Sequence, residues 1–297
     1  MLAFKDITPT DKEVIQHYTL NSARMNCDLA FSNLFTWRFL YHTQYAIFNN
    51  FLILRFYADG ELAYMMPIGE GCPGQTILAM IEDANQLNQP FQMLGVCVWM
   101  KEDIDRVLPG KFSYVTNRDY ADYIYMREDL VHLTGKKYQP KRNHINKFKK
   151  TYTNYEYRPL TPELIPECLE LEAKWCRANN CYEQESLVAE RKSLTCAFNH
   201  FSELGLTGGV LLVAGQIVAF TYGMPINRNT FDISIEKADT SIEGVYAMIN
   251  NEFVKRIPEQ YTYINREEDL GLEGLRKAKL SYQPAIILEK CTATLIK

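Results

Sequence analysis

The clearest candidate for chemistry is the stretch FDISIEK (231–237), in which apolar and polar residues alternate. Successive residues of a strand point to opposite faces. The alternation therefore predicts one polar face, formed by Asp232, Ser234 and Glu236. Either this face lines a binding cleft, in which Glu236 orients or deprotonates an amine, or the strand lies at a solvent-facing edge of its sheet.

A second candidate is the charged stretch from Asn265 to Pro284. Arg276 and Lys279 are three residues apart and would share one face of a helix. These cations could bind a phosphate or a carboxylate, and Lys279 could stabilise the oxyanion that forms during acyl transfer. The structural alternative is that the acids at 267–269 cap the helix and pair with the same cations.

A third candidate is the basic segment KKYQPKRNHINKFKK (136–150), which holds seven Lys or Arg residues in a chain of net charge −4. Apolar residues at helical spacing predict an amphipathic helix. Its outward-facing cations would be Lys141, Arg142, Lys149 and Lys150. These cations could simply be solvated on the helix surface. Alternatively, they could bind the phosphates of a tRNA or coenzyme A donor, or an anionic membrane surface.

Other motifs give weaker signals. The bend GEGCPG (69–74) is either a phosphate-binding loop or a tight turn, and Pro73 removes one amide donor. The five His and eight Cys residues lack the spacing of a metal site, so we expect no metal. Cysteines 168, 176 and 196 occupy apolar helix positions, which favours core packing over covalent catalysis.

Composition bounds the class of protein. Of the 297 residues, 47% are hydrophobic and 23% are charged, as in an ordinary globular protein. No apolar run approaches the roughly 18 residues of a membrane-spanning helix, and the N-terminal residues lack the pattern of a signal peptide. We therefore expect a soluble cytoplasmic protein with reduced thiols.

The order of predicted elements occurs twice along the chain. In each half, two helices precede a hairpin, a further helix and βαβ crossovers. The first half includes one long strand predicted over 44–57, and the second half ends with a strand predicted over 285–290. The pattern indicates an α/β fold, more fully α+β, with a mixed central sheet flanked by helices in each unit. We predict domains at 1–135 and 156–297, joined by a basic connecting helix at 136–155.

Three stretches carry a family resemblance: KKYQPKRNHINKF, FDISIEKADTSIEGVYAMINNEF and NREEDLGLEGLRKAKLSYQP. They resemble the family related to the C-terminal, cytosolic part of lysylphosphatidylglycerol synthase. The resemblance implies two tandem acetyltransferase-like (GNAT-like) domains, related to Fem-type aminoacyltransferases that use aminoacyl-tRNA. It also places the loop and helix after Asn265 beside the substrate cleft. It thereby adds three substrate-binding candidates to Asp232 and Ser234: Asn265, Asp269 and Tyr282.

One stretch of the sequence departs from the GNAT pattern, and it concerns the site for the acyl donor. The acyl-CoA loop of GNAT proteins is rich in glycine, whereas the corresponding stretch here, ADTSIEGVYA, contains Gly244 alone. A standard acetyl-CoA site is therefore not expected from the motif.

These observations predict an acyl or aminoacyl transferase. It would move an activated acyl group from aminoacyl-tRNA or acyl-CoA to an amine or hydroxyl, without a tightly bound cofactor. Glu236 would act on the acceptor, Arg276 and Lys279 would stabilise charge, and 136–150 would bind the donor's phosphates. The alternative is a non-catalytic protein of the same scaffold that binds RNA or an anionic surface through 136–150. A nucleotide-dependent oxidoreductase using GEGCPG ranks last.

Overall fold

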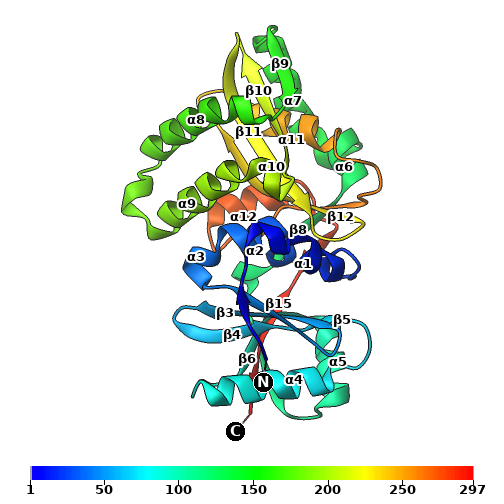
Figure 1. The fold of residues 1–297 in the computed structure, drawn as a ribbon. Helices are drawn as coiled ribbons and strands as arrows, with labels where there is room; N and C mark the ends of the chain where they lie inside the picture. Colours follow the sequence, from blue (N-terminus) through cyan, green and yellow to red (C-terminus); the bar gives the residue numbers. More distant parts are fainter. Residues whose placement is uncertain (1, 297) are drawn as a thin grey trace.

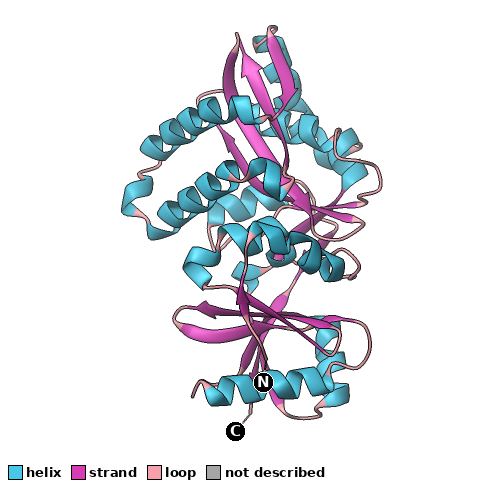
Figure 2. Ribbon diagram, in the orientation of Figure 1, coloured by secondary structure: helices cyan, strands magenta, loops and turns pink. Residues whose placement is uncertain are grey.

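The computed structural model describes residues 2–296, which form two mixed β-sheets with helices packed on both (Figures 1 and 2). Sheet A contains, in spatial order, β1 (Lys5–Asp6), β2 (Gln44–Phe48), β3 (Phe51–Ala58), β4 (Glu61–Met65), β6 (Gln92–Cys97), β15 (Lys290–Leu295) and β7 (Phe112–Thr116), with β5 (Ile68–Gly69) paired to β3. Sheet B contains β9 (Tyr155–Pro159), β10 (Thr207–Val213), β11 (Gln216–Pro225), β12 (Thr230–Ala238), β13 (Tyr263–Asn265), β8 (Asp122–Met126) and β14 (Ile286–Leu288).

The two sheets share one pattern of strand directions. In each, neighbouring strands are antiparallel except for a single parallel pair, which is β4–β6 in sheet A and β12–β13 in sheet B. The parallel pair occupies the fourth and fifth positions of both main strand orders. The repeated order predicted from the sequence is thus present in the topology.

Each sheet takes one strand from the other half of the chain. β15, near the C-terminus, pairs with β6 and β7 of sheet A, while β8 pairs with β13 and β14 of sheet B. The segments 112–126 and 286–295 therefore run antiparallel to each other through both sheets. The predicted boundaries at 135 and 156 do not follow sheet membership, and the predicted closing strand 285–290 is divided between two sheets.

Helices lie between the sheets and on their outer faces (Figure 1). Figure 1 shows α4 and α5 beside sheet A, and α1, α2, α3 and α12 between the two sheets. Alternate residues of β10 pack toward α8 and α9 on one face of sheet B and toward α7 and α11 on the other. The helices are α1 (Lys12–Thr19), α2 (Phe31–Thr36), α3 (Arg38–Tyr41), α4 (Gly74–Gln86), α5 (Val98–Val107), α6 (Arg127–His132), α7 (Gln139–Thr151), α8 (Ile165–Ala178), α9 (Glu185–Asn199), α10 (Phe201–Leu204), α11 (Val245–Val254) and α12 (Glu273–Leu280).

One apolar cluster joins the two halves. Phe31 and Phe35 of α2 pack in the same buried cluster as Leu194 and Phe198 of α9. Apolar burial at about 25 cal/mol per Å² stabilises this junction, so residues from both halves are held in fixed relation. Among the described helices, none combines the length and the apolar character that a membrane span requires.

Two sequence predictions of local structure need correction. The stretch 44–57 is a hairpin of two strands, because Asn49 and Asn50 both have positive φ and form a tight turn between β2 and β3. The basic segment forms α7 as predicted, but Ile145 and Phe148 bury its apolar stripe against α11 and sheet B. α7 is therefore a packed helix of the second unit rather than a free connection.

Candidate functional site

The parallel strands β12 and β13 separate after three paired residues, and polar side chains gather where they part. Asp232 and Asn265 form the last pair. β12 continues to Ala238, whereas β13 ends at Asn265 and the chain turns into a loop before α12. The polar side chains beyond this point face a loop instead of a neighbouring strand. We call this place the β12–β13 notch.

A bulge in β12 changes which side chains share a face. Ile235 packs in the cluster formed with α8 and α9, while Glu236 accepts a hydrogen bond from Asn250 of α11 at 3.1 Å. The prediction that Asp232, Ser234 and Glu236 share one face is therefore wrong, because one extra residue reverses the alternation. The edge-strand alternative is also wrong, since β12 lies between β11 and β13.

Gly223 of β11 makes this bulge possible. The register between β11 and β12 slips between Tyr222 and Gly223. A Cβ atom on Gly223 would lie 1.8 Å from the carbonyl oxygen of Asp232. Only glycine allows the two backbones to approach so closely. Gly223 thus fixes the backbone that presents Asp232.

Asp232 is fully buried and only partly satisfied by hydrogen bonds. Ser234 Oγ donates to Asp232 Oδ2 at 2.6 Å, whereas Oδ1 has no hydrogen-bond partner among the described residues. Burial raises the pKa of Asp232 well above its usual range, although the Ser234 bond opposes this. An unsatisfied buried acceptor costs about 1–3 kcal/mol, which a bound donor such as an ammonium would recover.

Glu267 brings a second carboxylate to the notch. Its backbone is left-handed, with φ +57°, and Asn33 Nδ2 of α2 donates to Glu267 Oε1 at 2.8 Å. Burial, followed by the charge of Asp232, raises the pKa of Glu267 well above its usual range. Because Asn33 belongs to the first half of the chain, both halves contribute to the site.

Lys279 of α12 lies near these two carboxyl groups. Its Nζ donates to the carbonyl oxygen of Arg266 at 2.5 Å and to that of Glu268. Burial lowers the pKa of Lys279, and the charge of Glu267 opposes this change. An ammonium has three donors, so a third N–H is available to a ligand.

Glu236 belongs to a neighbouring cluster on the α11 face. It accepts from Arg266 Nη2 at 3.1 Å, and the Arg266 guanidinium lies 4.6 Å from the ring centroid of Tyr282. Lys141 of α7 lies 3.7 Å from the same ring, and burial lowers the pKa of Lys141 to about 8. Arg266 Nη1 is buried without a hydrogen-bond partner in the described part of the chain. Lys141 therefore points toward the site rather than outward.

The other cations of α7 differ in exposure. Arg142 donates to the carbonyl oxygens of Leu133 and Gly135, the latter at 2.7 Å, and so caps the preceding segment. Lys149 and Lys150 are exposed. Four cations of α7 are predicted from the sequence to face outward. Lys141 and Arg142 do not, because they contact Tyr282 and the carbonyl oxygens of Leu133 and Gly135, respectively.

Arg276 is paired within the protein. Its Nε and Nη2 donate to the two carboxylate oxygens of Asp269 at 2.8 and 2.7 Å, and Nη2 also donates to Asp119 at 2.7 Å. The bond from Arg276 is the largest factor that lowers the pKa of Asp269, ahead of a smaller opposing effect of burial. This bidentate pair ties the loop after β13 to α12.

Asn265 links the notch to the first half of the chain. Its Nδ2 donates to the carbonyl oxygen of Met25 at 2.7 Å and to Asp122 Oδ2 at 2.8 Å. Its side chain is fully buried, so these bonds fix its orientation. Asn265 therefore has a structural role and anchors the end of β13 at the β12–β13 notch.

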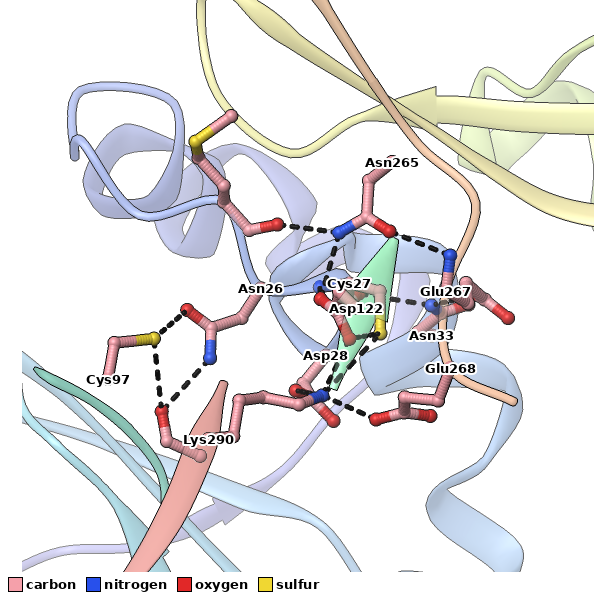
Figure 3. Close-up of polar contacts among 12 residues, drawn as sticks. Asn26, Cys27, Asp28, Asn33, Cys97, Asp122, Asn265, Glu267, Glu268 and Lys290 are labelled. Carbon is pink, nitrogen blue, oxygen red and sulfur yellow. Dashed lines mark hydrogen bonds and ion pairs between the residues drawn. The ribbon is translucent and has the colours of Figure 1, made fainter. Parts of the chain in front are cut away.

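Lys290 lies at the centre of an ion cluster (Figure 3), at the place where the antiparallel segments 112–126 and 286–295 lie side by side. Its Nζ lies 2.8 Å from Asp122 Oδ1 and 3.1 Å from Asp28 Oδ2, and it also pairs with Glu268. Burial alone would lower the pKa of Lys290, but the carboxylates of Asp122 and Asp28 raise it well above its usual range. This cluster joins β15 to β8 and to the loop after β13.

The same cluster has the ligand types of a metal site. Atoms of Cys27, Asp122 and Glu268 lie within 4.8 Å of one another. The Lys290 ammonium stands among them and supplies the positive charge that a cation would bring. Burial raises the pKa of the Cys27 thiol well above its usual range, which disfavours the thiolate that binds metals. All eight cysteines are free.

The two helix starts with glycine motifs are occupied by the protein's own chain. At α11, a Cβ on Gly244 would lie 2.4 Å from the carbonyl oxygen of His144, because α7 packs against this helix start. In GEGCPG, Gly69 pairs with Phe51 of β3, and Gly71 has φ +102°. The backbone geometry of GEGCPG is that of a turn.

The corresponding notch of sheet A is filled. After β4 and β6 part, Arg24 donates to the carbonyl oxygens of Met66 and Pro67, the latter at 2.5 Å. Asn26 donates to the carbonyl oxygen of Gly95 at 3.0 Å. The segment around Arg24 thus satisfies the backbone groups that the separation of the strands exposes.

Comparison with known proteins identifies the family. The sequence model described as phosphatidylglycerol lysyltransferase, C-terminal, matches residues 21–294. The chain belongs to the phosphatidylglycerol lysyltransferase C-terminal family. A solved structure from Bacteroides thetaiotaomicron, a conserved protein of unknown function, is 58% identical, covers 100% of both chains and has a TM-score of 0.98.

More distant structures show the fold of this family. The structure of L-PGS from Bacillus licheniformis is 15% identical over 98% of this chain and 93% of that chain, with a TM-score of 0.70. A tandem GNAT protein from the clavulanic acid biosynthesis pathway is 10% identical over 99% and 98%, with a TM-score of 0.50. The phosphatidylglycerol lysyltransferase C-terminal family member described here is thus a mixed α/β protein with an acyltransferase-like fold of two tandem GNAT-like units.

Sequence reasoning missed several residues of the site. Asn33 and Asp122 come from segments far from 231–284 in sequence, whereas Lys290 lies just beyond this stretch. Lys290 and Asp122 carried a signal, because each is the charged first residue of an otherwise uncharged strand, KCTATL and DYIYM. Asn33 becomes recognisable only when α2 is placed beside the loop after β13.

Proposed function

We propose that this family member is an aminoacyl transferase that moves an aminoacyl group from aminoacyl-tRNA to an amine or hydroxyl acceptor. Family membership and fold support acyl transfer in general. The observation that carries the aminoacyl assignment is Asp232, a fully buried carboxylate with one unpartnered oxygen. An aminoacyl group brings the ammonium that this oxygen lacks, whereas an acetyl group does not.

Three side chains at the β12–β13 notch would each have a separate role in the reaction. Asp232 would hold the α-ammonium of the donor, and the free N–H of Lys279 would donate to the ester carbonyl oxygen. As the acceptor attacks this carbonyl carbon, negative charge develops on that oxygen, and Lys279 stabilises it. Glu267 would accept the acceptor's proton, because its raised pKa brings it closer to working pH. The bond from the carbonyl carbon to the ribose oxygen then breaks, and the proton passes to that oxygen.

Neighbouring residues would position the substrates. Glu236 holds Arg266, whose unpartnered Nη1 could donate to an anionic oxygen of a substrate. The exposed Lys149 and Lys150 are available for donor phosphates. Arg276 would act indirectly, through its pairing with Asp269.

Acyl-CoA has less support as the donor. The start of α11 is in contact with α7, and the notch of sheet A is filled by the segment around Arg24. At the start of α11, the packed chain of α7 lies where a pyrophosphate would meet the backbone amides.

The proposal is tested by a matched pair of lysine variants. Lys279→Met removes the half-buried ammonium, while Lys277→Met changes an exposed lysine of the same helix. Release of labelled amino acid from bulk aminoacyl-tRNA would be measured with panels of amine and lipid hydroxyl acceptors. We expect Lys279→Met to lose about 10²–10³-fold in rate and Lys277→Met to match the wild type.

Two outcomes would contradict the proposal. Full activity of Lys279→Met would remove Lys279 from the chemistry. Binding of tRNA by the wild type without transfer to any acceptor would favour the alternative, a non-catalytic protein that binds RNA through the basic α7.

A further inference from the structure

Two surface hollows adjoin each other beside the junction of the two halves. One, of about 520 Å³, is lined by residues of α9, namely Val188, Arg191, Lys192, Thr195, Cys196 and Asn199, and by His200, which follows the helix. The other, of about 470 Å³, is lined by Asp6, Arg38, His42, Thr43, Gln44 and Tyr57. Arg38 joins them, because its Nη1 donates to Cys196 Sγ at 3.7 Å. We call the combined surface the α3–α9 groove.

The groove is basic in an acidic protein. Its lining includes Arg38, Lys192 and two histidines, together with Arg191, which is paired with the buried Glu172 at 3.2 Å, against Asp6 as the one acid of the lining. The whole chain, in contrast, has a net charge of −4. Arg38 uses only Nη1 in hydrogen bonds within the described residues, to Phe35 and Cys196. Its Nε and Nη2 therefore remain as donors, and Lys192 is exposed. A phosphate fits between such donors.

Aromatic rings accompany these cations. Lys192 Nζ lies 4.0 Å from the ring centroid of Phe39, and Trp37 stacks on Phe39 with centroids 6.3 Å apart. Tyr57 is 36% exposed and contacts His42 edge-on. A cationic groove with exposed rings is the usual way in which proteins bind single-stranded nucleic acid.

We infer that the α3–α9 groove binds a short single-stranded segment of RNA, with phosphates on Arg38 and Lys192 and bases against the neighbouring rings. The groove lies on the same side of sheet B as Tyr222 of β11, because Cys196 packs against the buried apolar cluster that contains Tyr222, and β11 pairs with β12, which carries Asp232. This inference deepens the proposed function, since it gives the single-stranded end of the tRNA donor a binding surface.

The test is equilibrium binding without turnover. The probe is a fluorescently labelled single-stranded RNA of about eight nucleotides, within the usual site size. Fluorescence anisotropy would be measured from 50 to 200 mM salt for the wild type, Lys192→Gln, and Lys192→Gln combined with Arg38→Gln. Lys111→Gln, an exposed lysine beyond the groove, is the control.

We expect the double variant to bind roughly tenfold more weakly at 50 mM salt. The slope of log affinity against log salt should fall by about 1.4, because each phosphate contact with a single strand contributes about 0.7. Lys111→Gln should bind like the wild type. The single variant Lys192→Gln, at an exposed position, decides the question if the double variant does not fold.

Unchanged RNA affinity in the variants would overturn the inference. So would equally tight binding of tripolyphosphate, which has the charge but no bases. Loss of binding to phosphatidylglycerol vesicles with unchanged RNA binding would assign the groove to a membrane surface instead. If RNA binds through Arg38 and Lys192 but no transfer occurs, only the proposed function fails. If transfer proceeds without them, only this inference fails.

Discussion

Replacing Lys290 by Met should destabilise the protein strongly, because the ammonium compensates buried carboxylates. Lys290 is 5% exposed, and its partner Asp122 is fully buried. Met has a similar length, so the packing is largely preserved and the lost charge dominates. Removing one partner of a buried ion pair costs about 3–5 kcal/mol. At about 2–4 °C per kcal/mol for a large domain, Tm should fall by roughly 6–20 °C.

Urea and thermal unfolding at pH 7.5 would measure this loss, with Lys277→Met as the exposed control. A double-mutant cycle with Asp122→Asn separates the pair from other effects. The coupling should be about 1–3 kcal/mol, because Asp122→Asn removes the charge that Lys290→Met leaves unpaired. A loss below about 1 kcal/mol, or additive effects in the cycle, would refute the claim that this pair holds the segments 112–126 and 286–295 together.

Two further predictions concern the backbone and the pH dependence. Gly223→Ala should destabilise the fold by about 1–3 kcal/mol, because its Cβ would lie 1.8 Å from the Asp232 carbonyl oxygen. Gly274→Ala, in the open part of α12, should instead stabilise the fold by about 0.5–1 kcal/mol. Urea unfolding of both variants would measure these two changes of opposite sign. Burial raises the pKa of Glu268 from 4.5 to about 7. The neutral form is favoured in the fold, so its contribution to stability is full below pH 4.5 and is lost as the pH rises to 7. Glu268→Gln should remove a decline of about 3 kcal/mol between these values, and parallel pH profiles of variant and wild type would contradict this.

Much of the fold could be predicted from the sequence, because hydrophobic periodicity is a local signal. The repeated order of elements, the helix at 136–150 and the turn at GEGCPG all follow from residue types and spacing. The pairing of β8 with β14 and of β7 with β15 could not be predicted, since pairing between segments more than 160 residues apart leaves no periodic trace.

The site was predicted less completely, for identifiable reasons. Asp232 and Lys279 do lie together, but the bulge opposite Gly223 moves Glu236 to another face. A bulge depends on the register with the partner strand, which one strand's sequence does not contain. Likewise, the burial of Lys141 depends on Tyr282, a residue 141 positions later, which the helical pattern of α7 cannot reveal.

The most direct test of the central claim is whether the notch selects a free amino group. Binding of a 3′-aminoacylamino-3′-deoxyadenosine would be compared with binding of its N-acetylated form by calorimetry, for the wild type, Asp232→Asn and the exposed control Asp59→Asn. We predict that the wild type and the control bind the free amine roughly tenfold or more tightly, and that Asp232→Asn loses this preference. Equal binding of both forms by the wild type would contradict the assignment of Asp232 to an ammonium, and with it the aminoacyl donor.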